Sequence, residues 1–376
     1  MNLEPFYSSL AKFFRKIYRK AFFLYIAFGR KRFTTKFLDD RMKYMKEKPL
    51  DAAQRHAIKN NWRGCKVDKR WFQFYNWTQV EKNTFEVNYV PDDLFYCFVY
   101  DHYNNTEELK AIDDKNYYDL YFPDVKQPRT IIHIIEGQCL DKDYKPVDYE
   151  TAVKMCVECG EIISKPSVYT GGGKKIHFWD KTQDVVVLEG LILEGENAII
   201  QEVVHQHPSL DMLHKGSINT IRIMTWYHDG IVEVLSTIVR MGVGDSQLDN
   251  ISQGGYYCGV NDDGSLKKWG YTNYGEPKLF HPQGAVFAEC TIPSIDECKE
   301  LVKRIAYRFI RVSKLASWDL SIDTEGNPIL IEANLSYGAL DLHQVANGPI
   351  FGDKGRDIVL EILRQKKYRR FNCVVK

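Results

Sequence analysis

The sequence predicts an α+β fold, in which two α/β subdomains with mixed, largely antiparallel sheets follow a helical N-terminal region. Its length, 376 residues, is more than one domain usually holds. Residues 5 to about 60 carry apolar side chains at helical spacing. From residue 111 onward, short apolar segments are joined by turns and hairpins, with few helices between them. That order favours antiparallel pairing over a doubly wound parallel sheet.

Residues 1–60 are expected to form a basic helical region. Up to Leu38 they contain nine Lys or Arg and one acid, Glu4. Aromatic helix faces usually pack against the rest of a protein, and we expect that here. The alternative is a helix lying on an anionic membrane surface. The side chains concerned are Lys12, Phe13, Phe14, Arg15, Lys16, Ile17, Arg19, Lys20, Ala21, Phe22, Phe23, Leu24, Tyr25, Phe28 and the basic cluster 30–32.

Three further segments complete the expected organisation. Residues 61–110, rich in aromatic side chains and containing YVPDDLFY, are expected to form an irregular α/β lead-in module. Residues 111–205 and 206–376 are expected to form the two subdomains. The expected strands are RTIIHII, EIISKP, DVVVLEGLIL, AIIQEVV, TIRIMTWY and IVEVLSTIVRMG, and the expected helices span 149–159 and 294–314.

Bulk properties exclude several classes of protein. A formal net charge of +1 gives no indication of nucleic-acid binding. Nine cysteines without regular spacing fit a reducing cytoplasm, and the lone Cys156-x-x-Cys159 pair falls at the end of an expected helix. No apolar run reaches the length of a membrane-spanning helix, and residues 21–28 lack a cleavage pattern, so no secretory signal is expected. We therefore expect a cytoplasmic protein.

A predicted β-hairpin holds the most informative side chains. Asp319 opens one short strand, and Glu332 and Asn334 end the next, with a turn at 324–327 between them. Residues two apart on a strand point to the same face, so Glu332 and Asn334 can converge on one point, with Asp319 opposite them. Oxygen ligands gathered in this way suit Mg²⁺, which leaves coordination positions for phosphates. A solvated hairpin with acidic ends is the alternative interpretation.

Other segments carry groups that suit phosphate chemistry. Lys165 lies near the end of an apolar strand, and the glycine run Gly171, Gly172, Gly173 follows it. Such a loop lets backbone N–H groups approach phosphate oxygens. Arg222 and Arg240, expected at strand ends, can clamp a transferring phosphoryl group. His205 and His207 lack the further ligands that a two-histidine metal site needs.

Taken together, these motifs resemble the ATP-grasp superfamily. The resemblance covers about residues 111 to 350. It rests on Asp114-Lys115-Asn116, Gln127-Pro128-Arg129-Thr130, Ile163-Ser164-Lys165-Pro166, Gly171–Gly173, Gln201–Val204, Asn219–Arg222, Arg240, Asn250, Gly254-Gly255 and the trio Asp319, Glu332 and Asn334. YVPDDLFY and the NTIRI…LDNISQGG stretch resemble more narrowly the sugar-transfer-associated ATP-grasp family, whose members are linked to surface-polysaccharide assembly.

The resemblance implies an ATP-grasp fold that holds ATP between two subdomains. It implies nucleotide binding by Lys115, Lys165, Gly171, Gly172, Gly173, Gln201, Glu202, Val203, Val204 and Asn219, catalysis by Arg222, Arg240 and Asn250, and metal binding by Asp319, Glu332 and Asn334. The expected metal is Mg²⁺, as two ions, with Mn²⁺ as a substitute.

The implied reaction is an ADP-forming ligation through an acyl phosphate, with a small carboxylate and a sugar-linked acceptor as substrates and no nucleic acid. Two alternatives stay open, a sugar kinase and a non-catalytic nucleotide-binding scaffold for glycosyltransferases. The complete set of Asp319, Glu332, Asn334 and both lysines speaks against the scaffold. The N-terminus would supply any peripheral contact with glycosyltransferases or the inner membrane face.

Overall fold

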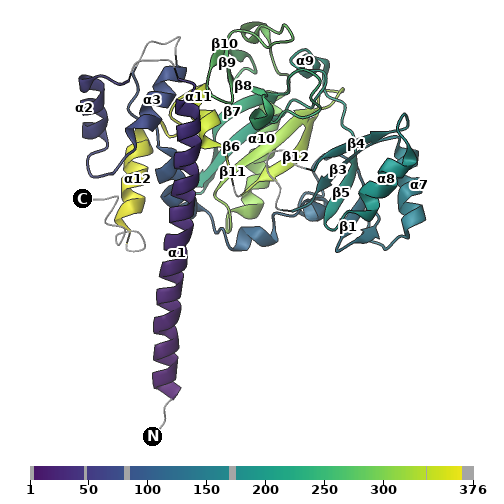
Figure 1. The fold of residues 1–376 in the computed structure, drawn as a ribbon, viewed down its shortest axis with the longest axis horizontal. Helices are drawn as coiled ribbons and strands as arrows, with labels where there is room; N and C mark the ends of the chain where they lie inside the picture. The colour runs from purple at the N-terminus through teal and green to yellow at the C-terminus, as the bar shows by residue number, and fades with distance from the viewer. Residues whose placement is uncertain (1–3, 46–48, 80–84, 169–174, 336, 366–376) are drawn as a thin grey trace. The chain divides into compact units, whose positions relative to one another are not determined.

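The structure, a computed structural model, describes residues 4–45, 49–79, 85–168, 175–335 and 337–365. In its first helix, the side chains of residues 4–9, 11, 19, 20, 22 and 23 are outside the description. The chain divides into two compact units, Met1–Tyr103 together with Gly348–Lys376, and Asn104–Asn347 (Figure 1). The expected assignment of 206–376 to one subdomain did not anticipate that the C-terminal segment belongs with the N-terminal unit.

The first unit opens on helix α1, Glu4–Met42, which is 39 residues long. Its C-terminal half packs on the unit through buried Leu38 and Arg41. The Arg41 guanidinium lies 3.6 Å from the ring centroid of Phe37 and 5.2 Å from that of Phe74. These cation–π contacts compensate for part of the cost of burying an arginine. Within the described residues, no helix is both long and apolar enough to cross a membrane.

The N-terminal half of α1 does not pack as expected. Most of its described large apolar side chains are between 39% and 73% exposed, namely Leu10, Phe13, Phe14, Ile17, Tyr18, Leu24, Tyr25 and Phe28. Contacts to the unit start on the other side of the helix, where Arg30 donates to the Tyr96 carbonyl at 2.9 Å and the Cys97 thiol to the Ala27 carbonyl at 3.3 Å. The expected packing is therefore wrong for these residues, while Arg19, Lys20, Phe22 and Phe23 lie outside the described side chains.

The remainder of the first unit is a helical assembly around an aromatic core. Trp71 stacks on Tyr75 with centroids 5.8 Å apart, and Tyr75 stacks on Tyr89 at 4.7 Å. Asp51 and Asp68 cap the helices that follow them. The elements are α2 Ala52–Asn61, α3 Lys69–Thr78, α4 Asp92–Leu94, the π-helix η2 Phe95–Val99, α5 Tyr100–Tyr103, η8 Gly352–Lys354 and α12 Gly355–Arg364.

The expected α/β lead-in module at 61–110 is wrong in its secondary structure, because its described residues contain helices and no extended strand. Aromatic residues favour strands as readily as buried helix faces, and YVPDDLFY lacks the alternation that separates the two. Here Pro91 precedes a helical turn, and the following aromatic residues are buried on all sides of η2.

The second unit begins with a five-stranded antiparallel sheet in the order β2-β1-β5-β3-β4. Helices α7 and α8 pack on it, and their buried side chains share one core with the strands (Figure 1). Cys156 lies in that core, so the cysteine pair belongs to a packed helix. The elements are β1 Thr130–Ile135, β2 Gln138–Leu140, α7 Tyr149–Cys159, β3 Glu161–Pro166, β4 His177–Asp180, α8 Val185–Leu193 and β5 Ala198–Glu202.

The strand expected for the segment DVVVLEGLIL is wrong, because this segment forms helix α8. Asp184 accepts a hydrogen bond from the Val186 N–H and so caps the helix. Leu188 and Ile192, one turn apart, are buried, whereas Val186 is 63% exposed. The run of β-branched residues suggested a strand, but the cap and the one-sided packing outweigh that propensity.

The larger sheet has seven antiparallel strands in the order β10-β9-β8-β7-β6-β11-β12. Its strands are β6 Ile221–His228, β7 Ile231–Met241, β8 Tyr256–Val260, β9 Leu266–Thr272, β10 Pro277–Lys278, β11 Leu315–Ile322 and β12 Pro328–Asn334. Helix α10, Ile295–Ala306, packs on one face, and α11, Leu340–Asn347, contacts β7 and β8. Shorter elements are η3 Glu108–Ala111, η4 Lys115–Tyr117, α6 Tyr118–Tyr121, α9 Pro208–Asp211, η5 Ile251–Gln253, η6 Phe287–Glu289 and η7 Tyr307–Phe309.

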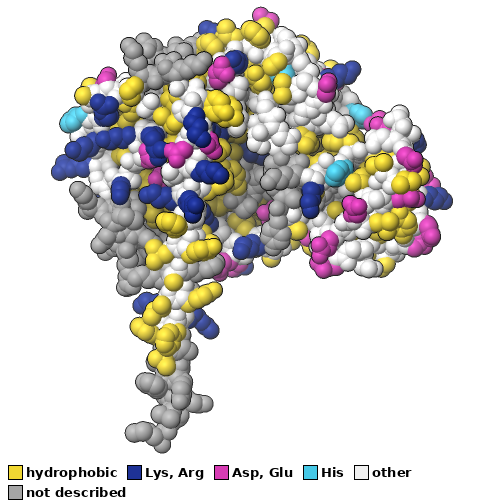
Figure 2. Space-filling view, viewed as in Figure 1, with side chains coloured by type: hydrophobic (Ala, Val, Ile, Leu, Met, Phe, Trp, Pro, Cys, Tyr) yellow, Lys and Arg dark blue, Asp and Glu magenta, His cyan; other side chains and the backbone are white. Residues whose placement is uncertain are grey.

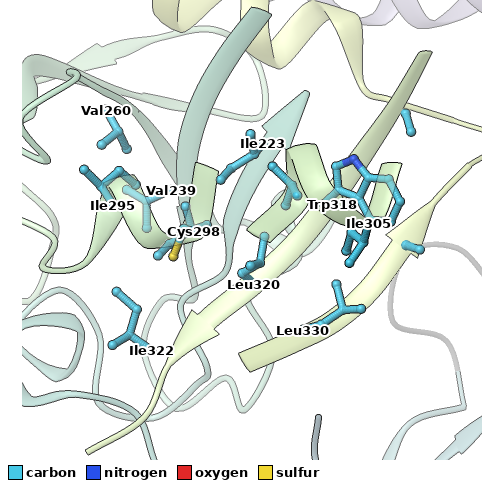
Figure 3. Close-up of a cluster of buried hydrophobic side chains, with 14 of the residues drawn as sticks. Ile223, Val239, Val260, Ile295, Cys298, Ile305, Trp318, Leu320, Ile322 and Leu330 are labelled. Carbon is cyan, nitrogen blue, oxygen red and sulfur yellow. The ribbon is translucent and has the colours of Figure 1, made fainter. Parts of the chain in front are cut away.

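The two faces of this sheet differ in chemistry. Along β11, Trp318 and Leu320 join the core under α10, where Figure 3 shows Trp318 close to Ile305. Ser317 and Asp319 alternate with them and therefore face the other side. All eight residues of β11 are buried, so this second face holds buried polar groups. The sheet thus separates an apolar core from a polar surface that needs partners.

The helix expected at 294–314 is shorter than predicted, because α10 ends at Ala306 and the 3₁₀ turn η7 follows it. Strand β11 consequently starts at Leu315, and Asp319 lies inside a strand instead of opening one, as the sequence suggested. Asn104 stabilises this early start, since its amide donates to the Leu315 carbonyl at 2.7 Å and accepts from the Leu315 N–H at 3.0 Å.

Candidate active site

The hairpin β11–β12 brings the three predicted metal ligands together. Asp319 pairs with Glu332 across the two strands, and Ser317 pairs with Asn334. Directly opposite residues have Cβ atoms about 5 Å apart on the same face of a sheet. The Asn334 side chain lies close enough to Asp319 to help lower the pKa of that carboxyl. Two carboxylates and one amide therefore converge on the polar face.

Asp319 is held by arginines from the neighbouring strands. Strand β6 pairs with β11, and Arg222 lies opposite Asp319. Arg222 donates from Nε to Oδ1 at 2.7 Å and from Nη2 to Oδ2 at 2.6 Å, while Arg240 donates to Oδ2 at 3.3 Å. Burial alone would raise the pKa of Asp319, but the charges of Arg222 and Arg240 lower it to about 2. The carboxylate is thus ionised despite being 1% exposed.

Arg240 has a support of its own. Its Nε donates to Thr220 Oγ1 at 2.9 Å, and its Nη2 donates to Asp249 Oδ1 at 3.2 Å. Asp249 also accepts from the Thr220 N–H at 3.2 Å and from the Thr220 hydroxyl. The planar guanidinium is therefore oriented by Thr220, which directly precedes β6, and by the loop residue Asp249 before any substrate is bound.

Glu332 is paired with a lysine from another part of the unit. Lys115 Nζ lies 2.8 Å from Glu332 Oε1, and the lysine is 9% exposed. Burial would lower the pKa of Lys115, but the Glu332 carboxylate reverses the effect and the pKa is raised. Lys115 is held in the fold by its N–H, which donates to the Ser167 carbonyl at 3.0 Å.

Lys165, on β3, is the second predicted phosphate-binding lysine. Burial, together with the charge of Lys115, lowers its pKa to about 8 against the opposing effect of Glu332. A lysine that is poorly stabilised by the protein in its charged form is suited to receive an anion. The structure therefore gathers Lys115, Lys165, Arg222 and Arg240 around the carboxylates of Asp319 and Glu332.

The remaining predicted residues are placed as follows. Gln201 is buried and its amide donates to the Pro128 carbonyl at 3.1 Å, so it joins β5 to the start of β1. Glu202 pairs with Arg129 at 3.0 Å on the surface. The Val203 N–H donates to the Glu161 carbonyl at 3.3 Å, and Val204 follows the end of β5. Gly171, Gly172 and Gly173 lie outside the described residues.

Asn219 and Asn250 have local structural partners. The Asn219 amide donates to the carbonyls of Leu210 at 2.8 Å and His214 at 2.7 Å. Asn250 accepts from the Ser252 N–H at 3.1 Å and caps η5. Both asparagines thus shape the segments that lead to Arg222 and carry Asp249.

Two residues near this cluster were missed by sequence reasoning. The Tyr118 hydroxyl donates to the Ala333 carbonyl at 3.3 Å and accepts from its N–H at 3.2 Å, so it holds the strand between Glu332 and Asn334. His343, on α11, contacts Ser236 through Nδ1 at 2.8 Å. Burial, with Arg222 next, lowers the pKa of His343 to about 3, so the imidazole is neutral. No local motif marks either residue, because both act through contacts that are distant in sequence.

The chemistry of the donor set fits one Mg²⁺ ion. Within the described residues, no group of three or more His, Cys, Asp or Glu side chains gathers into a metal-binding cluster. The candidate site therefore depends on Asn334 as a third donor beside Asp319 and Glu332. Mg²⁺ commonly takes one or two carboxylates and a neutral oxygen from the protein, while phosphates and water complete its coordination shell.

Comparison with known proteins adds a family to this geometry. Among solved structures, the chain is similar to D-cycloserine synthetase DcsG, at 14% identity and a TM-score of 0.41, over 81% of this chain and 93% of that one. It is similar to D-alanyl-alanine synthetase A from Vibrio cholerae at 11% identity and a TM-score of 0.36, over 69% of this chain and 63% of that one. It is similar to the ATP-grasp ligase PsnB, complexed with minimal precursor, Mg and ADP, at 14% identity and a TM-score of 0.38, over 70% of this chain and 62% of that one.

The matches to the Vibrio and PsnB structures thus span less than two thirds of those chains. No curated protein matches the chain closely enough to count as a relative. Residues 98–356 match the family described as "Sugar-transfer associated ATP-grasp". This match covers well over half of the sequence and includes both sheets, and it agrees with the resemblance seen in the motifs. The chain belongs to the sugar-transfer-associated ATP-grasp family.

Proposed function

We propose that the chain is an ATP-dependent ligase that joins a carboxylate to an amine or another nucleophile. One observation carries the proposal: four cationic side chains from different elements lie around the carboxyl groups of Asp319 and Glu332 on the polar face of the larger sheet. Such a cluster matches a substrate that brings several negative charges together with a divalent metal. ATP with Mg²⁺ is that substrate, and the family to which the chain belongs is named for ATP-grasp.

In this proposal the cations change partners when substrate binds. Lys115 and Lys165 would bind oxygens of the α- and β-phosphates, and Asp319, Glu332 and Asn334 would hold Mg²⁺. The metal, when bound, offsets charge on the β- and γ-phosphates. The ion pairs of the substrate-free protein, Lys115 with Glu332 and Arg222 with Asp319, keep these charges balanced until then. Mg²⁺ and ATP are therefore expected to bind cooperatively.

The proposed ligation has two chemical steps. A carboxylate oxygen of the first substrate attacks the γ-phosphorus, the bond to the β-phosphate oxygen breaks, and ADP leaves. The nucleophile then attacks the acyl carbon, loses its proton and displaces phosphate. Arg240, oriented by Thr220 and Asp249, would hold the carboxylate and then the acyl phosphate in place.

We further propose that the acceptor is a sugar or sugar-linked precursor of surface polysaccharide. The family description supports this substrate class. Amino acids are sensible first carboxylates for a trial, because each is a small molecule that carries the group to be activated. A second Mg²⁺ ion, beside the one that the donor set of Asp319, Glu332 and Asn334 fits, and a cytoplasmic location complete the proposal.

The test combines purified protein, Mg-ATP, a pool of amino acids and a pool of nucleotide sugars. A ligase releases ADP and phosphate only when both pools are present, and mass spectrometry finds a conjugate without phosphorus added. Phosphate left on a sugar would identify a kinase and overturn the ligase. Lys165→Ala and Glu332→Ala should abolish turnover without unfolding the protein. Lys181→Ala and Glu325→Ala, at exposed positions in the turn after β4 and in the hairpin turn, are the matched controls.

A further inference from the structure

Helix α1 presents a stripe of exposed apolar side chains along the N-terminal part of its length. Its members are Leu10, Phe13, Phe14, Ile17, Tyr18, Leu24, Tyr25 and Phe28, and Tyr25 and Phe28 are more than 70% exposed. With 3.6 residues per turn, these positions fall within an arc of about 140°. Figure 2 shows apolar side chains along this part of the helix, and in Figure 1 it extends beyond the other helices of the first unit. Contiguous exposed apolar surface of this kind marks a binding surface.

Three basic side chains lie beside the first part of the stripe, between residues 10 and 18. Lys12, Arg15 and Lys16 are exposed, and by the same helical geometry they lie in the arc that the apolar stripe leaves open. The sequence from Pro5 to Leu38 contains no carboxylate side chain, since Glu4 is the single Asp or Glu up to Leu38. The combination of an apolar stripe and an acid-free basic face is the pattern of helices that lie in the interface of an anionic bilayer.

The direction of the stripe agrees with a role outside the fold. Farther along α1, Ala27, Arg30, Leu38 and Arg41 make the contacts to the first unit. Those four positions lie outside the arc of the stripe. The face of α1 that packs on the first unit is thus different from the face that carries the apolar stripe. The packing contacts of the unit therefore do not involve the stripe.

We propose that α1 docks the protein on an anionic lipid surface, with the stripe inserted between headgroups and the basic side chains facing lipid phosphates. Charge decides between lipid and a second copy of the chain as the occupant. Two α1 helices pairing through their stripes would bring basic residues together without a carboxylate to balance them. A lipid surface supplies the missing negative charge. This docking does not depend on the reaction at the ATP site.

The experiment is co-sedimentation of the full-length protein with vesicles of phosphatidylcholine alone or with about one third phosphatidylserine. Binding to the anionic vesicles is expected, with a loss of about tenfold or more between about 0.1 M and 0.5 M salt, because salt screens the basic residues. Lack of binding at low salt overturns the proposal. So does equal binding to both vesicle types, because it removes the role of charge.

Two variants separate the two contributions. Phe14→Ser with Tyr25→Ser removes apolar insertion, and Lys12→Glu with Lys16→Glu reverses the charge; each should lower vesicle binding at least tenfold. Matched controls on the second unit are Val186→Ser, which is 63% exposed, and Lys154→Glu, with a side chain 76% exposed. These should bind as the unaltered protein does. Lipid docking would be refuted if the control variants lost vesicle binding as much as the α1 variants do. It would also be refuted if the protein did not bind vesicles and instead formed a salt-insensitive dimer that the α1 variants abolish.

Discussion

Arg222 and Asp319 face each other across strands β6 and β11 and share two hydrogen bonds, of 2.7 and 2.6 Å, with both residues almost wholly buried. The pair joins the two roles assigned to this part of the chain. Asp319 is a proposed metal ligand, and in the absence of metal its charge is balanced by a residue proposed for catalysis. Replacing Asp319 should therefore lower the free energy of unfolding, through the loss of the partner of Arg222, and should separately lower the affinity for Mg²⁺.

We expect Asp319→Ala to destabilise the protein by about 3–5 kcal/mol, because it leaves the buried Arg222 charge without its partner. Glu332→Gln should cost less, since the Glu332 side chain is 30% exposed and the new amide oxygen can still accept a hydrogen bond from Lys115. Both changes should abolish Mg²⁺-dependent ATP binding. Chemical denaturation and titration calorimetry measure the two effects. Equal losses of stability in the two variants would show that the Arg222–Asp319 pair contributes no more to folding than the Lys115–Glu332 pair.

The lowered pKa of Lys165 predicts a dependence of stability on pH. In the substrate-free fold its pKa is about 8, below its ordinary value of 10.5. The folded state therefore binds fewer protons than the unfolded chain between these values. The cost of holding the charged lysine is present in full below about pH 8 and is relieved as pH rises toward 10.5.

Replacing this residue should separate stability from function. Lys165→Met should raise the melting temperature at pH 7 and lessen the increase of stability above pH 8, while removing ATP binding. Thermal unfolding between pH 7 and 10 tests this, with Lys181→Met as a control for a surface lysine. A melting temperature that falls in Lys165→Met at pH 7 would contradict a strained charge at this position.

Tyr118→Phe should weaken the metal site without contacting it. The change removes the two hydrogen bonds that hold Ala333 between Glu332 and Asn334, at a cost of about 1 kcal/mol each. We expect Mg²⁺ affinity to fall more than ATP affinity measured without metal. Tyr121→Phe, on the same short helix α6, is the control. If both variants bind Mg²⁺ equally well, Tyr118 serves packing alone.

Arg240→Lys should keep the charge of the site but lose its orientation. Lysine cannot reach Thr220, Asp249 and Asp319 at once, as the guanidinium does. We expect kcat to fall by about 10²-fold with little change in ATP affinity. Thr220→Val, which removes one support, should give a smaller loss in the same direction. A normal kcat in Arg240→Lys would show that a positive charge at this position is sufficient for catalysis and that the orientation of the guanidinium is not needed.

Much of the site could be predicted from local patterns. The spacing of Glu332 and Asn334 implied a shared strand face, and the turn between the strands implied that Asp319 lies opposite them, as the register now shows. What failed were segments in which propensity and packing disagree. The valine-rich α8 was expected as a strand, and the aromatic stripe of α1 was expected to be covered.

The chain's own pattern was sufficient to predict the α+β class, the antiparallel strands and the family, and it supplied the candidate residues for binding phosphate and metal. These features depend on periodicity, turn residues and short spacings, which are local properties of the sequence. The tertiary structure alone decided which cation meets which carboxylate: Lys115 with Glu332, and Arg222 with Asp319, which are 97 residues apart. Such pairings depend on strand order and burial, because a charge removed from water is stable only beside the partner that the fold brings to it.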